Sequence, residues 1–344
     1  MSNTYNNRYA RILLGRREQK DLNIEFNWSN LDPNKTILDK QTILVFGGNT
    51  ANSSKDANGY AKSVESLLDN RFRKNTDILS FSYRTEPIKN GSGNSKFLEP
   101  EYAEEMHEIF NTLLKPLLYD NLGNMKEKQG IEKTFRKLIF VAHCGGSNFV
   151  DLIIDDFYAT LLEKYQPATA ELLLKKIQYF AYAPNEFPNH DVTSFYVNPY
   201  IDSNYSWARA LSLIDNQGVD VDYPKGVSKK IFKASNRCQP GVVFQDIFQE
   251  YRASMFRSGQ ALYLIPDRMN PDFISGDHSI GCITKDKIVN SNTEFEQTAQ
   301  LVNNAAKIVL NQFASEEQFN NRATFDHIAG LIYDNPPTCQ RSFE

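Results

Sequence analysis

The chain has 344 residues, of which 41% are hydrophobic and 23% charged, and it carries a formal net charge of −4. This length and composition are typical of a globular protein, and we expect a single domain over residues 1–344. The slight excess of negative charge gives no electrostatic basis for nucleic-acid binding, which depends on many basic contacts to phosphates. The sequence contains no run of about 18 apolar residues, so we expect no transmembrane helix.

The N-terminus and the cysteines indicate the compartment in which the protein folds. The first eight residues are polar and lack the apolar stretch of a secretory signal, so we expect no such signal. The cysteines are widely spaced and form no C-x-x-C pair, which is typical of reduced thiols. They are Cys144, Cys238, Cys282 and Cys339. We therefore expect a cytoplasmic protein, although secretion without a leader would leave the same features.

Apolar runs bounded by turn residues predict strands, and apolar residues at helical spacing predict helices. In chain order these patterns predict strands at 9–14, 23–28 and 42–46, a helix at 57–68, a strand at 77–83, a helix at 101–118, a strand at 138–141, a helix at 148–162, strands at 177–184, 192–202 and 259–266, and a helix at 295–313. We interpret Arg16 and Arg17 as part of an exposed turn, residues 121–136 as helix ends and loop, and residues 203–258 as an inserted cap. Because strands and helices alternate, the sequence predicts an α/β fold with a doubly wound, mostly parallel sheet.

One stretch combines a buried strand, a glycine-rich turn and the beginning of a helix. Four apolar residues lead into A-H-C-G-G at residues 142–146. A turn that exposes a nucleophile in this way is tight, so the residues two before and two after the nucleophile have to be small. Around Cys144 these are Ala142 and Gly146. The same turn leaves the N–H of Gly145 available to a developing oxyanion.

This arrangement resembles the nucleophile elbow of the α/β-hydrolase superfamily, with cysteine in place of the usual serine. In that superfamily the triad follows the chain order nucleophile, acid, histidine, and Cys144, Asp202 and His278 occur in this order. The order also resembles the class 3 lipase group, in which Asn-x-x-Asp at a strand end precedes a late histidine. Here the spacing from Asn198 to Asp202 is one residue longer. The resemblance implies that His278 activates Cys144 and that Asp202 orients His278.

The resemblance further implies an oxyanion hole built from two backbone N–H groups. One is that of Gly145, and the other comes from the loop after the strand at 42–46, where Gly48 or Asn49 is the candidate. A cysteine paired with histidine is strongly nucleophilic at neutral pH. We therefore expect thioesters and activated acyl groups as substrates.

Other residues remain as alternatives for these roles. His190 is the second candidate for the base, while we expect His107 and His327 to be structural or exposed. We expect His143 to point away from the nucleophile and to pack, and Ser147 to lie in the first turn of the helix. Three further carboxylates are open as the acid: Asp191, Asp215 and Asp267.

We expect no cofactor and no metal ion. His143, Cys144, His278 and Cys282 are zinc-type ligands, but adjacent side chains such as the first two usually diverge. The sequence contains no G-x-x-x-x-G-K-[ST] or G-x-G-x-x-G pattern that would indicate nucleotide binding.

The sequence thus predicts a hydrolase or acyltransferase whose substrate is an ester or thioester of a small molecule or lipid. The alternative is a catalytically inactive α/β-hydrolase scaffold that binds a protein or lipid partner. The 23 phenylalanines and 17 tyrosines could form a recognition surface as readily as a pocket.

Overall fold

The computed structural model describes residues 12–20, 23–31, 40–48, 54–83, 106–182, 188–199, 260–265, 305–315 and 324. The cap expected at 203–258 lies outside these residues. The expectation of a single domain over 1–344 therefore stays a prediction. No helix within the described ranges is long and apolar enough to cross a bilayer.

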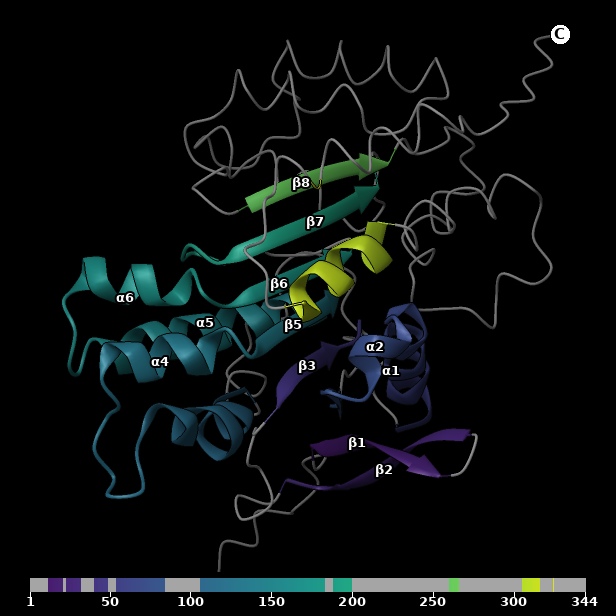
Figure 1. The fold of residues 1–344 in the computed structure, drawn as a ribbon, viewed down its shortest axis with the longest axis horizontal. Helices are drawn as coiled ribbons and strands as arrows, with labels where there is room; N and C mark the ends of the chain where they lie inside the picture. Colours follow the sequence, from purple (N-terminus) through teal and green to yellow (C-terminus); the bar gives the residue numbers. More distant parts are fainter. Residues whose placement is uncertain are drawn as a thin grey trace, which may run out of the picture.

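The described strands form one eight-stranded sheet in the order β2-β1-β4-β3-β5-β6-β7-β8 (Figure 1). Their bounds are β1 Leu13–Lys20, β2 Asn23–Asn30, β3 Gln41–Phe46, β4 Thr76–Ser82, β5 Leu138–His143, β6 Gln178–Tyr182, β7 Thr193–Pro199 and β8 Gln260–Ile265. Neighbouring strands from β4 across to β8 pair in parallel, and only β1 runs antiparallel to its neighbours β2 and β4. The predicted α/β fold with a mostly parallel sheet is confirmed.

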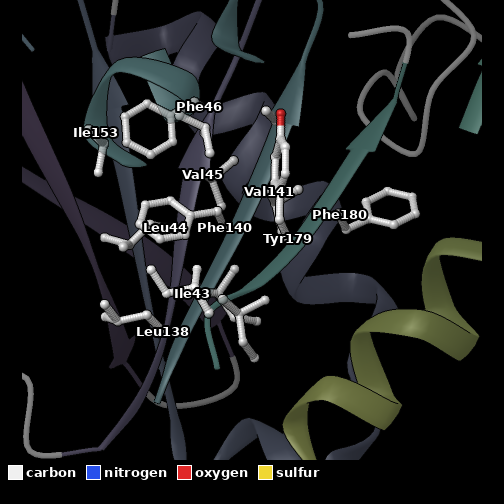
Figure 2. Close-up of a cluster of buried hydrophobic side chains, with 14 of the residues drawn as sticks. Ile43, Leu44, Val45, Phe46, Leu138, Phe140, Val141, Ile153, Tyr179 and Phe180 are labelled. Carbon is white, nitrogen blue, oxygen red and sulfur yellow. The ribbon is translucent and has the colours of Figure 1, made fainter. Parts of the chain in front are cut away.

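The two central strands are apolar without alternation because both of their faces are covered. Every residue of β3 and of β5 is buried, as expected for strands of a parallel sheet with helices on both sides. Phe46 of β3 stacks on Phe81 of β4 with ring centroids 4.7 Å apart. Figure 2 shows Phe46 and Phe140 near Ile153 on one face, while Phe180 points toward the helix at 305–314 on the other.

Helices cover both faces of the sheet. The described helices are α1 (Ser54–Leu67), α2 (Asn70–Arg73), α4 (Lys128–Phe135), α5 (Gly146–Leu161), α6 (Pro167–Leu174), and helical segments at 106–118 and 305–314. In Figure 1, α4, α5 and α6 lie together and apart from α1 and α2. The helix at 305–314 belongs with α1, because Asn311 Nδ2 donates to the carbonyl of Leu67 at 2.9 Å.

The chain changes direction across the sheet at β3. From β3 it moves through α1 to β4 on one side, and the later strands β5, β6, β7 and β8 follow on the other side. In open α/β sheets, ligands bind outside the carboxyl ends of the strands at such a switch point. The neighbouring carboxyl ends of β3 and β5, which pair up to Phe46 and Ala142, are therefore the place where a site is expected.

Two local predictions were wrong. Arg16 and Arg17 lie within β1 rather than in an exposed turn, because β1 continues to Lys20. The segment 121–136, expected to be helix ends and loop, contains α4, whose Ile131 and Phe135 are fully buried. These two apolar residues are four positions apart, so one helical face is sufficient to bury both.

Candidate active site

The turn between β5 and α5 holds Cys144 in a rare backbone conformation. Its φ is 51°, and Cys144 is the one non-glycine residue with a positive φ in the described ranges. This left-handed region costs an ordinary side chain of order 1 kcal/mol or more. A strained strand-to-helix turn of this kind is what a nucleophile elbow requires.

Hydrogen bonds on both sides hold Cys144 in this conformation. Its N–H donates to the carbonyl of Tyr182 at 3.2 Å, which continues the pairing of β5 with β6 by one residue. Its carbonyl accepts from the N–H of Ser147 at 3.0 Å and from the Oγ of Ser147 at 2.8 Å. Ser147 thus lies in the first turn of α5, as predicted, and its hydroxyl is engaged by the turn itself.

Gly146 allows α5 to begin directly against the end of β3. A Cβ at this position would collide with the carbonyl oxygen of Phe46 and would lie 2.5 Å from that of Gly47. Ala142, two residues before Cys144, is fully buried. Close packing therefore requires glycine at position 146, for the reason that the sequence pattern suggests, and the alanine at position 142 lies in the buried strand end.

Gly48 and Cys144 lie side by side, although they are nearly a hundred residues apart in the chain. A Cβ on Gly48 would lie 3.0 Å from the Cβ of Cys144 and 3.1 Å from Nδ1 of His143. The end of β3 is also held by Tyr83, whose ring lies against Phe149 of α5 and whose hydroxyl donates to the carbonyl of Gly47. Of the residues expected around the oxyanion, Gly48 and Gly145 both border Cys144, while Asn49 lies outside the described residues.

His143 packs, as expected, but it contacts the same glycine as Cys144. Its ring stacks on Tyr182 with centroids 5.5 Å apart, and its Nδ1 lies 3.3 Å from the Oη of Tyr60. All three side chains are buried. Sequence reasoning missed Tyr60, because a tyrosine on the apolar face of a helix carries no sign of which strand end it will meet.

Asp202 and His278 lie outside the described residues, so their roles stay predictions. The strands that precede them are described: β7 ends at Pro199 and β8 at Ile265. Both strands run parallel to β5, so they end at the edge of the sheet where Cys144 lies.

The alternative base and one alternative acid are placed elsewhere. His190 precedes β7 and therefore lies toward the amino ends of the strands, opposite to Cys144. Its Nδ1 lies 2.8 Å from Glu171 Oε1 and its Nε2 lies 3.3 Å from Asp155 Oδ1. Hydrogen bonds to these two carboxylates raise the pKa of His190, although burial acts against them. Asp191, beside it, pairs with Lys175 at 3.2 Å.

The described side chains include no group of three or more His, Cys, Asp or Glu residues arranged to hold a metal ion. His278 and Cys282, the second half of the zinc alternative, lie outside the described ranges.

Comparisons with known proteins give little further information. No protein-family model and no curated protein matches the chain. Among solved structures, a structure of FAE is 10% identical with a TM-score of 0.31, and the match covers 76% of this chain and 82% of that one. A mutant feruloyl esterase module from Clostridium thermocellum, complexed with sinapinate, is 10% identical with a TM-score of 0.28 at the same coverage. Likeness of this size carries no argument about activity, so function is argued from the site itself.

Proposed function

We propose that this protein is an acyl-directed hydrolase or acyltransferase with Cys144 as its nucleophile and an α/β-hydrolase-like arrangement of the site. The observation that carries the proposal is the positive φ of Cys144 in a strand–turn–helix unit at the switch point of the sheet. Strain of this kind persists only where the surrounding structure imposes it, and it is concentrated at active sites.

The proposed reaction has two steps. In the first, His278 accepts the thiol proton and the sulfur of Cys144 attacks the carbonyl carbon of an ester or thioester. The tetrahedral intermediate collapses as the bond to the leaving alcohol or thiol breaks, and His278 returns the proton to that group. In the second step, His278 accepts a proton from water or another acceptor, which attacks the carbonyl carbon of the acyl-cysteine; the carbon–sulfur bond breaks, and His278 returns the proton to the sulfur of Cys144. Asp202 orients His278 in both steps.

We assign the stabilisation of the negative charge that develops on the carbonyl oxygen to backbone N–H donors. The N–H groups at the beginning of α5 have no partner within the helix, and Gly145 immediately precedes its first residue. Gly48, packed against Cys144, begins the loop that would supply the second donor together with Asn49. Two fixed donors in a buried site stabilise an oxyanion far more strongly than water does.

Steady-state hydrolysis of a panel of acyl thioesters and aryl esters tests the proposal. We expect Cys144→Ala and His278→Ala each to lower kcat/KM by roughly 10³-fold or more, and Asp202→Asn to lower it by a smaller factor. His190→Gln is the matched control, because this histidine is held at the opposite edge of the sheet, and its activity should stay within about twofold of wild type. A folded wild-type protein without turnover, or a Cys144→Ala variant as active as wild type, would support the non-catalytic scaffold instead.

A further inference from the structure

Two tyrosine hydroxyls lie close to the end of β3. On the face covered by α5, Tyr83 donates to the carbonyl of Gly47. On the face covered by α1, the Oη of Tyr60 would lie 3.5 Å from a Cβ on Gly48. The first contact fixes one carbonyl of the Gly47–Gly48 segment, and the second closes the space on its other side.

Tyr60 acts together with His143. Its Oη lies 3.3 Å from Nδ1 of that ring, and the two ring centroids are 5.8 Å apart. The ring of Tyr182 also stacks on that of His143, at an interplanar angle of 14°. The imidazole thus contacts two tyrosines, and its Nδ1 lies close to the Tyr60 hydroxyl and to Gly48.

A buried polar pair at this position needs an explanation. Both side chains are 6% exposed, and removing a hydroxyl and an imidazole from water is costly unless they form hydrogen bonds. Apolar side chains of similar shape would pack there without this cost. What the polar pair adds is a directional bond that fixes both partners next to Gly48.

We propose that Tyr60 and His143 are positioning residues that hold the Gly47–Gly48 segment against Cys144 at the distance an oxyanion hole needs. The inference rests on the proposed function and adds two residues to it. His143 is covalently joined to Cys144 and Tyr60 belongs to α1, so their hydrogen bond ties the nucleophile turn to the helix that follows the oxyanion loop. Neither residue touches the substrate. Backbone donors misplaced by a fraction of an ångström lose much of their effect on a transition state.

Removing only the hydroxyl tests the positioning role. Tyr60→Phe should lower kcat roughly tenfold, the factor that corresponds to one ordinary hydrogen bond, and should leave KM unchanged because the oxyanion exists only in the transition state. The rate of Cys144 alkylation by iodoacetamide should also stay unchanged, since the thiol itself is not altered.

Tyr165→Phe is the matched control. The hydroxyl of Tyr165 donates to the carbonyl of Lys126 at 2.6 Å, so this variant also loses one hydrogen bond. Tyr165 follows the end of the 16-residue α5, about 24 Å along the helix from the site. Its kcat should equal that of wild type.

Two substitutions of His143 distinguish its nitrogens. An asparagine amide reaches about as far as Nδ1, whereas a glutamine amide reaches the position of Nε2. His143→Asn should therefore retain most of the wild-type kcat, and His143→Gln should lose about as much as Tyr60→Phe. In the Tyr60→Phe background, the two substitutions should have equal effects.

The rate of amide hydrogen exchange at Gly47 and Gly48 measures how firmly this segment is held, and it needs no substrate. It should become roughly tenfold faster in Tyr60→Phe and stay unchanged in Tyr165→Phe. Unchanged exchange and an unchanged kcat in Tyr60→Phe would overturn the inference. If exchange changes as expected while no activity depends on Cys144, the proposed function fails and the structural role of the pair stands.

Discussion

Cys144 combines a thiol side chain with a backbone conformation that a non-glycine residue rarely adopts. The surrounding residues compensate for this strain: Ser147 donates two hydrogen bonds to its carbonyl, and Tyr182 accepts one from its N–H. Gly146 lets the next turn of chain lie directly on the end of β3. The strain is therefore maintained by contacts from two strands and one helix.

A methyl group at position 146 should disrupt this arrangement. Gly146→Ala brings its Cβ into the carbonyls of Phe46 and Gly47, which are backbone atoms and cannot rotate away. We expect the free energy of unfolding to fall by about 2 kcal/mol or more, measured by urea denaturation. Gly59→Ala in α1, where nothing lies within 4 Å of the new Cβ, should instead stabilise the protein by about 1 kcal/mol. Equal effects of the two substitutions would contradict this account of the turn.

At the scale of residues, the sequence was sufficient to find the turn and Gly48 beside it, but not Tyr60. The small residues Ala142 and Gly146 around Cys144 are adjacent in the chain and mark the turn directly. Tyr60 meets His143 only after β3 and β5 have paired and α1 has packed on their face. Such contacts depend on tertiary structure, so no spacing along the chain reveals them.

At the scale of elements, His190 joins α5, α6 and the beginning of β7. Its two nitrogens reach Asp155 of α5 and Glu171 of α6, and its ring stacks on Tyr158 with centroids 3.9 Å apart. The neighbouring Lys175–Asp191 ion pair makes a second link at the same edge. This end of the sheet is thus held by charged contacts, in contrast to the apolar packing of β3 and β5.

The stability that His190 contributes should depend on pH. Because its pKa is raised in the folded protein, its contribution is fully present below the ordinary histidine pKa of about 6.5 and is lost as the pH rises through the folded value. His190→Gln should therefore lower the free energy of unfolding by about 1–2 kcal/mol at about pH 5.5 and by less at about pH 9. The difference in the free energy of unfolding between wild type and variant, measured at both pH values, gives the contribution of His190 alone. A difference that grows with pH would contradict the assignment.

The elements that the sequence predicted best are those whose burial is unambiguous. The apolar runs at 42–46 and 138–141 correspond to β3 and β5, and the helix expected at 57–68 corresponds to α1 at Ser54–Leu67. The errors fall on polar segments. The eight-residue α4 buries only two side chains, Ile131 and Phe135, and the polar end of β1 lacks the alternation that marks a half-buried strand.

At the scale of the whole molecule, a partly buried arginine adds to the strand pairing that attaches the β1–β2 hairpin to the parallel sheet. The guanidinium of Arg17 donates to the carbonyls of Arg73 and Thr76 and lies 4.0 Å from Glu65 of α1. Arg73 Nε lies 3.3 Å from the same carboxylate oxygen of Glu65. Burial lowers the pKa of Arg17, and the charge of Glu65 acts against this. The group thus links the antiparallel edge to α1 and to the chain leading into β4.

Removing this arginine should loosen the edge of the sheet. Arg17→Leu leaves the carbonyls of Arg73 and Thr76 without this donor and removes one of the two guanidinium groups beside the buried carboxylate of Glu65. We expect a loss of about 3 kcal/mol in the free energy of unfolding. Arg71→Ala is the control, because its side chain is 73% exposed and its ion pair with Asp69 is 3.9 Å long; such pairs contribute about 1 kcal/mol or less. Chemical denaturation of both variants measures the contrast. If Arg17→Leu unfolded at the wild-type denaturant concentration, the hairpin would not depend on this contact.

The overall topology explains why the site could be located from the sequence while its full geometry could not. The switch of direction at β3 brings Gly48 close to Cys144. This proximity could be expected from the sequence, which has a glycine turn after one strand and a nucleophile elbow after a later strand. Which of several acids and histidines meets Cys144 depends on how the chain returns after β7 and β8. The assignment of Asp202 and His278 rests on their order along the chain and stays a prediction.

The most direct test of the central claim is the mass of the intact protein during turnover. After brief incubation with an acyl thioester and an acid quench, wild-type protein should carry one acyl group, and peptide mapping should place it on Cys144. His278→Ala should acquire the group much more slowly, and Cys144→Ala should never acquire it. A folded wild-type protein that stays unmodified with every thioester of the panel, or one that is acylated equally in Cys144→Ala, would contradict the assignment of Cys144 as the nucleophile.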